Sequence, residues 1–118
     1  MKKVLVVNDN EKIQSIVRTF GELLSFAAIQ ATSLKEGKDL YDQNQDVDLI
    51  VMDGSVDNNH ELDSIPLVKE MRKTYEGPIL AASSNFLYNE DLIRAGCSHK
   101  IDSPGDLIAK IRLILGIE

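Results

Sequence analysis

Short apolar runs alternate along the chain with longer segments whose apolar residues recur every three or four positions. The runs are brief, rich in branched residues and bounded by polar or turn-forming residues. Such runs are typical of strands buried in a parallel sheet. They predict five strands, at residues 4–7, 26–31, 48–53, 78–82 and 100–102.

The periodic segments predict five helices, and capping residues locate their starts. The run Asn8-Asp9-Asn10 suits the start of the first helix, and Ser33 with Glu36 forms a capping-box pattern before the second. Ser64 precedes the third helix, and Ser103-Pro104 precedes the last. The apolar residues of the first helix predict its inner face: Ile13, Ile16, Val17, Phe20 and Leu24. The third helix is predicted to end at Gly77 and the fourth at Gly96. The inner face of the third should contain Ile65, Val68, Met71 and Tyr75, and that of the last Leu107, Ile108, Ile111 and Ile114.

Strict alternation of strands and helices indicates right-handed βαβ units. The first and third runs are the most apolar and should be central. We therefore predict an α/β fold: a flavodoxin-like, doubly wound, five-stranded parallel sheet of order 2-1-3-4-5, in three α/β/α layers with five helices. In this topology the ends of strands one and three, Asn8-Asp9 and Asp53, converge at the crevice.

Composition narrows the possible functions. The chain has 118 residues, 43% hydrophobic and 27% charged, which fits one domain over 1–118 with no separate output domain. Its net charge is −6, and its longest basic run is Lys2-Lys3, which argues against direct nucleic-acid binding. The single cysteine, Cys97, reads as a small buried residue of a cytoplasmic protein. No apolar run reaches membrane-spanning length. We expect a monomer or weak dimer.

The converging carboxylates suggest a metal site. Asp9 and Asp53 would repel each other, and Mg²⁺ prefers one or two carboxylates with a carbonyl and retained waters. The backbone carbonyl of Ser55 is a plausible third ligand, and Asn8 would bind through a metal-bound water. A flavin or nucleotide held directly by its phosphate is not expected, because no glycine-rich loop follows the first strand.

Five segments together resemble a response-regulator receiver domain: residues 4–9, 48–53, 78–83, 95–98 and 103–104. The resemblance covers essentially the whole chain and is to a single-domain receiver of the chemotaxis type. Each motif is weak alone, but their order and spacing are specific.

The resemblance implies a phosphoacceptor of two-component phosphorelay signalling. Asp53 would take a phosphoryl group from a histidine kinase or phosphotransfer protein, and Asp9 would hold the assisting Mg²⁺. Ser83 stands at the position of the family's Thr or Ser, whose hydroxyl bonds the phosphoryl oxygen. The signal would pass on through contacts with an output protein that the sequence does not name.

The chain also departs from the family pattern, as an atypical receiver. Asn8 replaces one acid of the usual acidic pair, Ser103 replaces the lysine before Pro104, and Lys100 replaces the aromatic residue of strand five. The loop over 54–63 is longer than usual and lacks the usual proline. Its polar side chains could fold back on the site: Asp57, His60, Glu61 and Asp63.

Three functions therefore compete. The first is a stand-alone phosphoacceptor; the second is a degenerate receiver that binds proteins without phosphorylation-dependent switching. The third, an enzyme of the same fold, is disfavoured because no catalytic base lies beside a nucleophile. Simpler roles also exist for single residues: Asp53 as a turn residue, Ser83 as a strand end, and the 57–63 segment, including His60, as a solvated loop.

Overall fold

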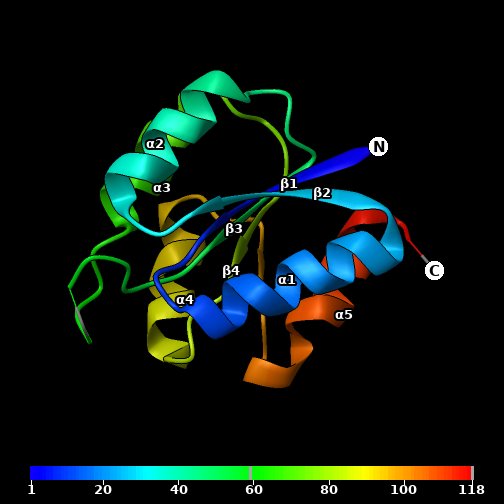
Figure 1. Ribbon diagram of the computed structural model, residues 1–118. Helices are drawn as coiled ribbons and strands as arrows, with labels where there is room; N and C mark the ends of the chain where they lie inside the picture. The colour runs from blue at the N-terminus through cyan, green and yellow to red at the C-terminus, as the bar shows by residue number, and fades with distance from the viewer. Residues whose placement is uncertain (59, 118) are drawn as a thin grey trace.

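The computed structural model describes residues 1–58 and 60–117, and within them the chain forms one five-stranded parallel sheet (Figure 1). The strand order is β2-β1-β3-β4-β5, with all four neighbouring pairs parallel. This confirms the predicted flavodoxin-like order. The strands are β1 (Lys2–Val7), β2 (Phe26–Ala31), β3 (Leu49–Met52), β4 (Ile79–Ala81) and β5 (His99–Lys100).

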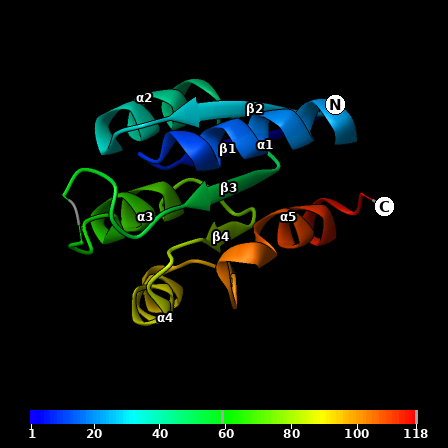
Figure 2. The same cartoon turned by 60° about the horizontal axis from the view of Figure 1, so that its bottom comes forward.

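Helices cover both faces of the sheet, which gives the predicted three layers (Figure 2). One face packs against the first and last helices, and the other packs against the three between them. The helices are α1 (Glu11–Leu24), α2 (Leu34–Gln43), α3 (Ile65–Arg72), α4 (Phe86–Ala95) and α5 (Leu107–Leu115), with a 3₁₀ turn, η1 (Pro104–Asp106), before the last. Among the described residues, no helix is both long and apolar enough to cross a membrane.

The two central strands supply both halves of the core. Alternate residues of a strand point to opposite faces. Leu5 and Ile50 accordingly pack toward α2, α3 and α4, whereas Val4 and Leu49 pack toward α1 and α5, and all four are fully buried. Burying such a side chain contributes about 1.5–3 kcal/mol, so the continuous apolar runs place β1 and β3 at the centre.

The predicted inner face of α1 is only partly correct. Val17 is buried, but Ile16 and Phe20 are 43% and 38% exposed, and the polar Gln14 is buried instead. The reason is a close approach at Gly21, where a Cβ atom would lie 2.8 Å from the carbonyl oxygen of Phe26. Contact at this position turns the helix so that Gln14 and Gly21 face the sheet.

Gln14 is tolerated in the core because its carboxamide joins the ends of two strands. Its Nε2 donates to the carbonyl oxygens of Val6 at 3.1 Å, Asn8 at 2.9 Å and Ala31 at 3.0 Å. Gln30 donates in turn to the Oε1 of Gln14 at 3.0 Å. The network fixes the segment that carries the residues after β1.

Several element boundaries differ from the prediction. Helix α3 ends at Arg72 rather than at Gly77. The Arg72 guanidinium donates to the carbonyls of Tyr75 and Gly77, and these bonds hold the following residues in a turn instead of a further helical turn. Strand β5 covers His99–Lys100 and stops before Asp102. There the amide of Asp102 donates to the Asp106 carboxylate rather than to a neighbouring strand.

The predicted caps are confirmed at two helices and differ at a third. Asn10 Oδ1 accepts from Lys12 and Ile13 at the start of α1, and Ser33 Oγ accepts from Glu36 N at the start of α2. Ser64 is fully buried and does not cap α3 through its side chain. Its hydroxyl donates to the carbonyl of Gly54 at 3.1 Å, which ties α3 to the residue after Asp53.

We expect Gln14→Met to destabilise the protein by about 2–3 kcal/mol, since it leaves buried carbonyls without their donor. Urea unfolding followed by circular dichroism measures this loss. The control is Gln45→Met, because Gln45 is exposed; it should change stability by less than about 0.5 kcal/mol. Equal effects of the two variants would contradict the role given to Gln14.

Candidate functional site

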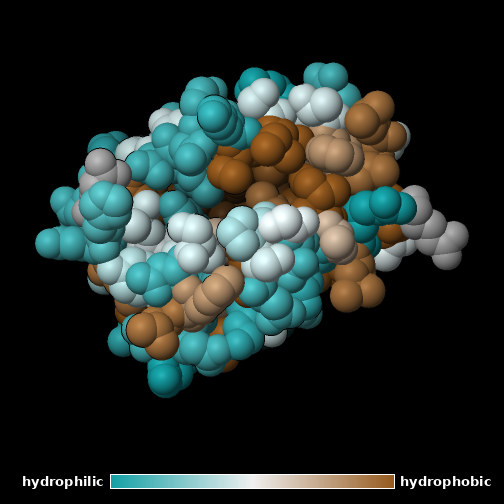
Figure 3. Space-filling view, turned by 90° about the horizontal axis from the view of Figure 1, so that it is seen from below, coloured by the Kyte–Doolittle hydropathy of each residue, from teal (hydrophilic) through white to brown (hydrophobic). Residues whose placement is uncertain are grey.

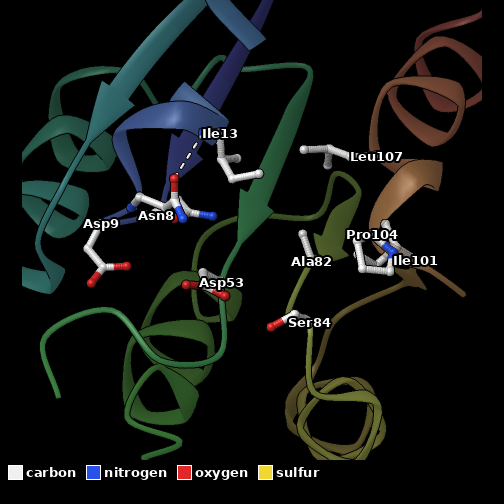
Figure 4. A pocket seen from close by; sticks show the side chains of 10 residues that line it. Asn8, Asp9, Ile13, Asp53, Ala82, Ser84, Ile101, Pro104 and Leu107 are labelled. Carbon is white, nitrogen blue, oxygen red and sulfur yellow. Dashed lines mark hydrogen bonds between the residues drawn. The ribbon is translucent and has the colours of Figure 1, made fainter. Parts of the chain in front are cut away.

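A cavity of about 180 Å³ opens where β1, β3 and β4 end (Figure 4). Parallel pairing aligns Val7 with Met52, so the residues that follow these strands lie side by side. The amide of Asp53 donates to the carbonyl of Val7 at 3.0 Å. The structure thus brings together Asn8, Asp9 and Asp53 at one cavity, as the sequence predicted.

Asp53 is a partly buried carboxylate in negative surroundings. Its Oδ1 accepts from the amide of Gly54 at 2.9 Å. Burial, with a smaller contribution from the charges of Asp9 and Asp63, raises the pKa of Asp53 to about 6, against the lowering effect of the Gly54 and Ser55 amides. Among the described residues, no lysine or arginine lies close enough to Asp53 to lower the pKa of its carboxyl group.

Asn8 and Asp9 differ in exposure and in role. Asp9 is exposed, whereas Asn8 is only 5% exposed. The Oδ1 atom of Asn8 accepts from the amide of Asn10 at 2.8 Å. Because the oxygen is held there, the side-chain nitrogen is the atom that Asn8 turns toward the cavity. The predicted contact of Asn8 with a metal-bound water stays a prediction.

Of the two serines after β4, Ser84 lines the cavity. Figure 4 shows its hydroxyl directed to the side on which Asp53 lies. Ser83 is 4% exposed, and its Oγ accepts from the amide of Asn85 at 3.0 Å. A Cβ atom on Gly54 would lie 3.1 Å from that Oγ, so Ser83 packs directly beneath the residue after Asp53. Because Oγ is the acceptor in that bond, the hydroxyl proton of Ser83 is not used in it, and the predicted contact of Ser83 with a phosphoryl group stays a prediction.

The loop after Asp53 folds around one carboxylate, that of Asp63. Asp63 accepts from the amides of Val56, Asp57 and Asn58, each at 2.8 Å. Its own amide donates to the carbonyl of Gly54 at 3.0 Å. Asp63 is therefore the loop residue that holds the segment beside Asp53, a role that composition alone did not single out.

The other polar residues of the loop point elsewhere. Asp57 accepts from the amide of Leu34, at the start of α2, at 3.1 Å. The carbonyl of His60 accepts from the Tyr88 hydroxyl of α4. The predicted polar segment also includes Asn59, which lies outside the described residues. The loop thus links Asp53 to α2 and α4.

Neither Ser103, at the position of the family's lysine, nor Lys100, at the position of its aromatic residue, brings a positive charge to the cavity. Ser103 does not line it, and neither does Lys100, which forms an ion pair with Glu90 of α4. The wall at that end consists of Ile101, Pro104 and Leu107. The cavity is therefore negative on one side and apolar on the other.

The donor set at the cavity fits Mg²⁺. Asp9 and Asp53 offer two carboxylates, and Ser55 offers a backbone carbonyl in the adjoining loop, with space for retained waters. Across residues 1–58 and 60–117, no three His, Cys, Asp or Glu side chains converge as a metal cluster. Magnesium does not need such a cluster, whereas structural zinc would.

Comparisons with known proteins agree with this fold. No family model matches the chain. The transcriptional regulatory protein CpxR of Escherichia coli K12 is 27% identical over 98% of this chain and 50% of its own, so the chain spans about half the length of the curated relatives it matches.

Solved structures of receiver domains superpose closely. The receiver domain of Francisella response regulator 1452 has a TM-score of 0.80 at 25% identity, over 98% of both chains. A response regulator from Burkholderia pseudomallei, solved with a phosphorylated aspartic acid, calcium ion and citrate, has a TM-score of 0.82 at 17% identity, over 97% of this chain and 66% of its own. In both sequence and fold the chain is therefore similar to the receiver domains of two-component response regulators.

Proposed function

We propose that the domain accepts a phosphoryl group on Asp53, with Mg²⁺ held by Asp9, Asp53 and the Ser55 carbonyl. The observation that carries this proposal is the partly buried Asp53 carboxylate beside Asp9 at an open cavity of about 180 Å³. The phosphorylated aspartic acid of the Burkholderia structure, on the same fold, supports it.

In the proposed phosphoryl transfer, the exposed side of the Asp53 carboxylate meets the phosphoryl donor. An Asp53 oxygen attacks the phosphorus of a phosphohistidine on the partner, the P–N bond breaks, and an acyl phosphate forms. The imidazole leaves with the electron pair of that bond and takes up a proton. Bound Mg²⁺ would supply positive charge for the transferring phosphoryl oxygens. The amides of Gly54 and Ser55 already point at the carboxylate and orient it.

Ser83 and Ser84, which follow β4, are the hydroxyl donors that we propose for the phosphoryl group. Ser84 lines the cavity, and Ser83 keeps its hydroxyl proton for a phosphoryl oxygen because its Oγ only accepts from Asn85. Because Ser83 packs on Gly54, a movement of Ser83 toward the phosphoryl group would shift the 54–63 loop and the α4 end that contacts it. The output would be a changed protein-binding surface rather than turnover of a separate substrate.

The partners we propose are a histidine kinase or phosphotransfer protein and an output protein. Direct binding to nucleic acid is not proposed, since the net charge of −6 gives no clustered cationic face. The predictions of a stand-alone, cytoplasmic protein and of a monomer or weak dimer stay predictions.

A degenerate receiver is the alternative, and one observation favours it. No cation stands beside Asp53 in the described residues, because Ser103 lies outside the cavity lining and Lys100 is paired with Glu90. Such a site would bind a partner through its surface and would take no phosphoryl group.

Incubation with acetyl phosphate and Mg²⁺ should add one phosphoryl group, detected by intact-mass spectrometry. Asp53→Asn should abolish the adduct, since it removes the attacking oxygen's charge. Asp39→Asn, at an exposed position of α2, is the matched control and should keep the adduct. An unmodified wild type with both acetyl phosphate and a phosphohistidine donor would support the degenerate receiver.

Asp53→Asn should also stabilise the protein, in a pH-dependent way. The folded pKa of about 6 lies above the ordinary 3.8, so the contribution of Asp53 to stability is fully present below about pH 4 and is lost as the pH rises through 6. At neutral pH the variant should be more stable by about 1–3 kcal/mol, and near pH 4 the difference should vanish.

Urea unfolding at a series of pH values measures this difference. Added Mg²⁺ should stabilise the wild type above pH 6 and leave Asp53→Asn nearly unchanged, because the cation offsets the charge of the carboxylate. A pH-independent difference would contradict the raised pKa of Asp53.

Ser103→Lys should strengthen binding of beryllofluoride, a phosphoryl analogue, by tenfold or more if the new ammonium group reaches the cavity, which corresponds to about 1.4 kcal/mol. Fluorine NMR of the bound analogue measures its retention. Ser98→Lys, on the other side of β5, is the control, because the described Ser98 hydroxyl contacts Ile79 rather than the cavity. Equal retention by the two variants would mean that the position of Ser103 does not serve Asp53.

A further inference from the structure

The proposed phosphoryl transfer assigns no role to the apolar half of the cavity. Five apolar residues line it, from α1, from the end of β4 and from the segment that runs from β5 into the start of α5: Ile13, Ala82, Ile101, Pro104 and Leu107. Figure 4 shows Ile101, Pro104 and Leu107 across the cavity from Asp9 and Asp53. A hydrated metal ion at the carboxylates would leave this wall in contact with water.

The polar half carries negative charge and a free donor. The charged residues of the lining are both acidic: Asp9 and Asp53. Asn8 is 5% exposed, and its oxygen is occupied by Asn10. Its side-chain nitrogen has no hydrogen-bond partner among the described residues. Every fully enclosed side-chain polar atom of those residues does have a partner. The Asn8 nitrogen is therefore not enclosed, and it opens onto the cavity that Asn8 lines.

These features together select one kind of small molecule. A cationic group matches the two carboxylates, an oxygen atom accepts from Asn8, and a short aliphatic chain covers the apolar wall. A carboxylate on the ligand would be repelled by Asp9 and Asp53. We propose that the cavity is a binding site for a small aliphatic amino alcohol, bound as its ammonium ion between Asp53 and the Ile101–Leu107 wall.

The site goes beyond the proposed phosphoacceptor function, and it would regulate that function. The ammonium group would occupy the place of Mg²⁺ at Asp53, so ligand and metal should compete. Occupancy would then lower the rate at which Asp53 accepts a phosphoryl group, and the domain would respond to the ligand as well as to its kinase.

A titration of the ¹⁵N-labelled chain with valinol, followed by amide chemical shifts, tests the site without any phosphoryl donor. We expect saturable shifts at Asp9, Asp53 and Ser84, with a dissociation constant in the millimolar range, as suits a ligand of this size. Added Mg²⁺ should weaken the apparent affinity. Because no phosphorylation is measured, failure here is distinct from failure of the phosphoacceptor proposal.

Two probes separate the parts of the ligand. Ethanolamine keeps the ammonium and hydroxyl groups but lacks the aliphatic chain, and isopentyl alcohol lacks the charge. Both should bind at least tenfold more weakly than valinol. Equal binding of ethanolamine would overturn the role of the apolar wall, and equal binding of isopentyl alcohol would overturn that of the carboxylates.

Two variants locate the site, each with a control. Ile13→Phe should fill the cavity and abolish the shifts, whereas Leu23→Phe, at a 70% exposed position of the same helix, should keep them. Asp53→Asn should weaken binding about tenfold, and Asp39→Asn should not change it. The proposal is overturned if valinol gives no saturable shifts, or if neither Ile13→Phe nor Asp53→Asn reduces them.

Discussion

The parallel pairing of β1 with β3 is the constraint on which the rest of this molecule depends. Both strands are buried on both faces, so each half of the core rests on their side chains. The same pairing places Asn8 and Asp9 beside Asp53, because the strands end at one edge with Val7 opposite Met52. The interaction that stabilises the fold therefore also concentrates negative charge at one cavity.

That charge has no counterion in the described protein, and this shapes the chemistry. Burial and the charges of Asp9 and Asp63 raise the pKa of Asp53 to about 6, so the site favours a proton or a cation from outside. A divalent metal, a transferred phosphoryl group with its metal, and an organic ammonium ion would each bring positive charge to the carboxylates. The absence of a lysine at Ser103 makes the site more dependent on what it binds.

The loop over 54–63 shows how the fold connects this charge to its surface. Asp63 gathers three amides of the loop, and the Ser64 hydroxyl bonds the Gly54 carbonyl. The Tyr88 hydroxyl bonds the His60 carbonyl from α4. A change at Asp53 therefore has a physical route to α4, through the hydrogen bonds that side chains make to the loop backbone rather than through the family's aromatic residue of strand five.

The sequence by itself determined the strand order, the layers and the identity of the converging residues, because continuous apolar runs must be buried centrally and parallel strands end at one edge. Only the tertiary structure decided which face of α1 turns inward: a local pattern favoured Ile16 and Phe20, but the close approach at Gly21 and the hydrogen bonds of Gln14 determined the packing. It also decided that Asp63 supports the loop and that Ser84 faces the cavity while Ser83 packs on Gly54. These features depend on contacts between segments distant in the chain, and no local period encodes them.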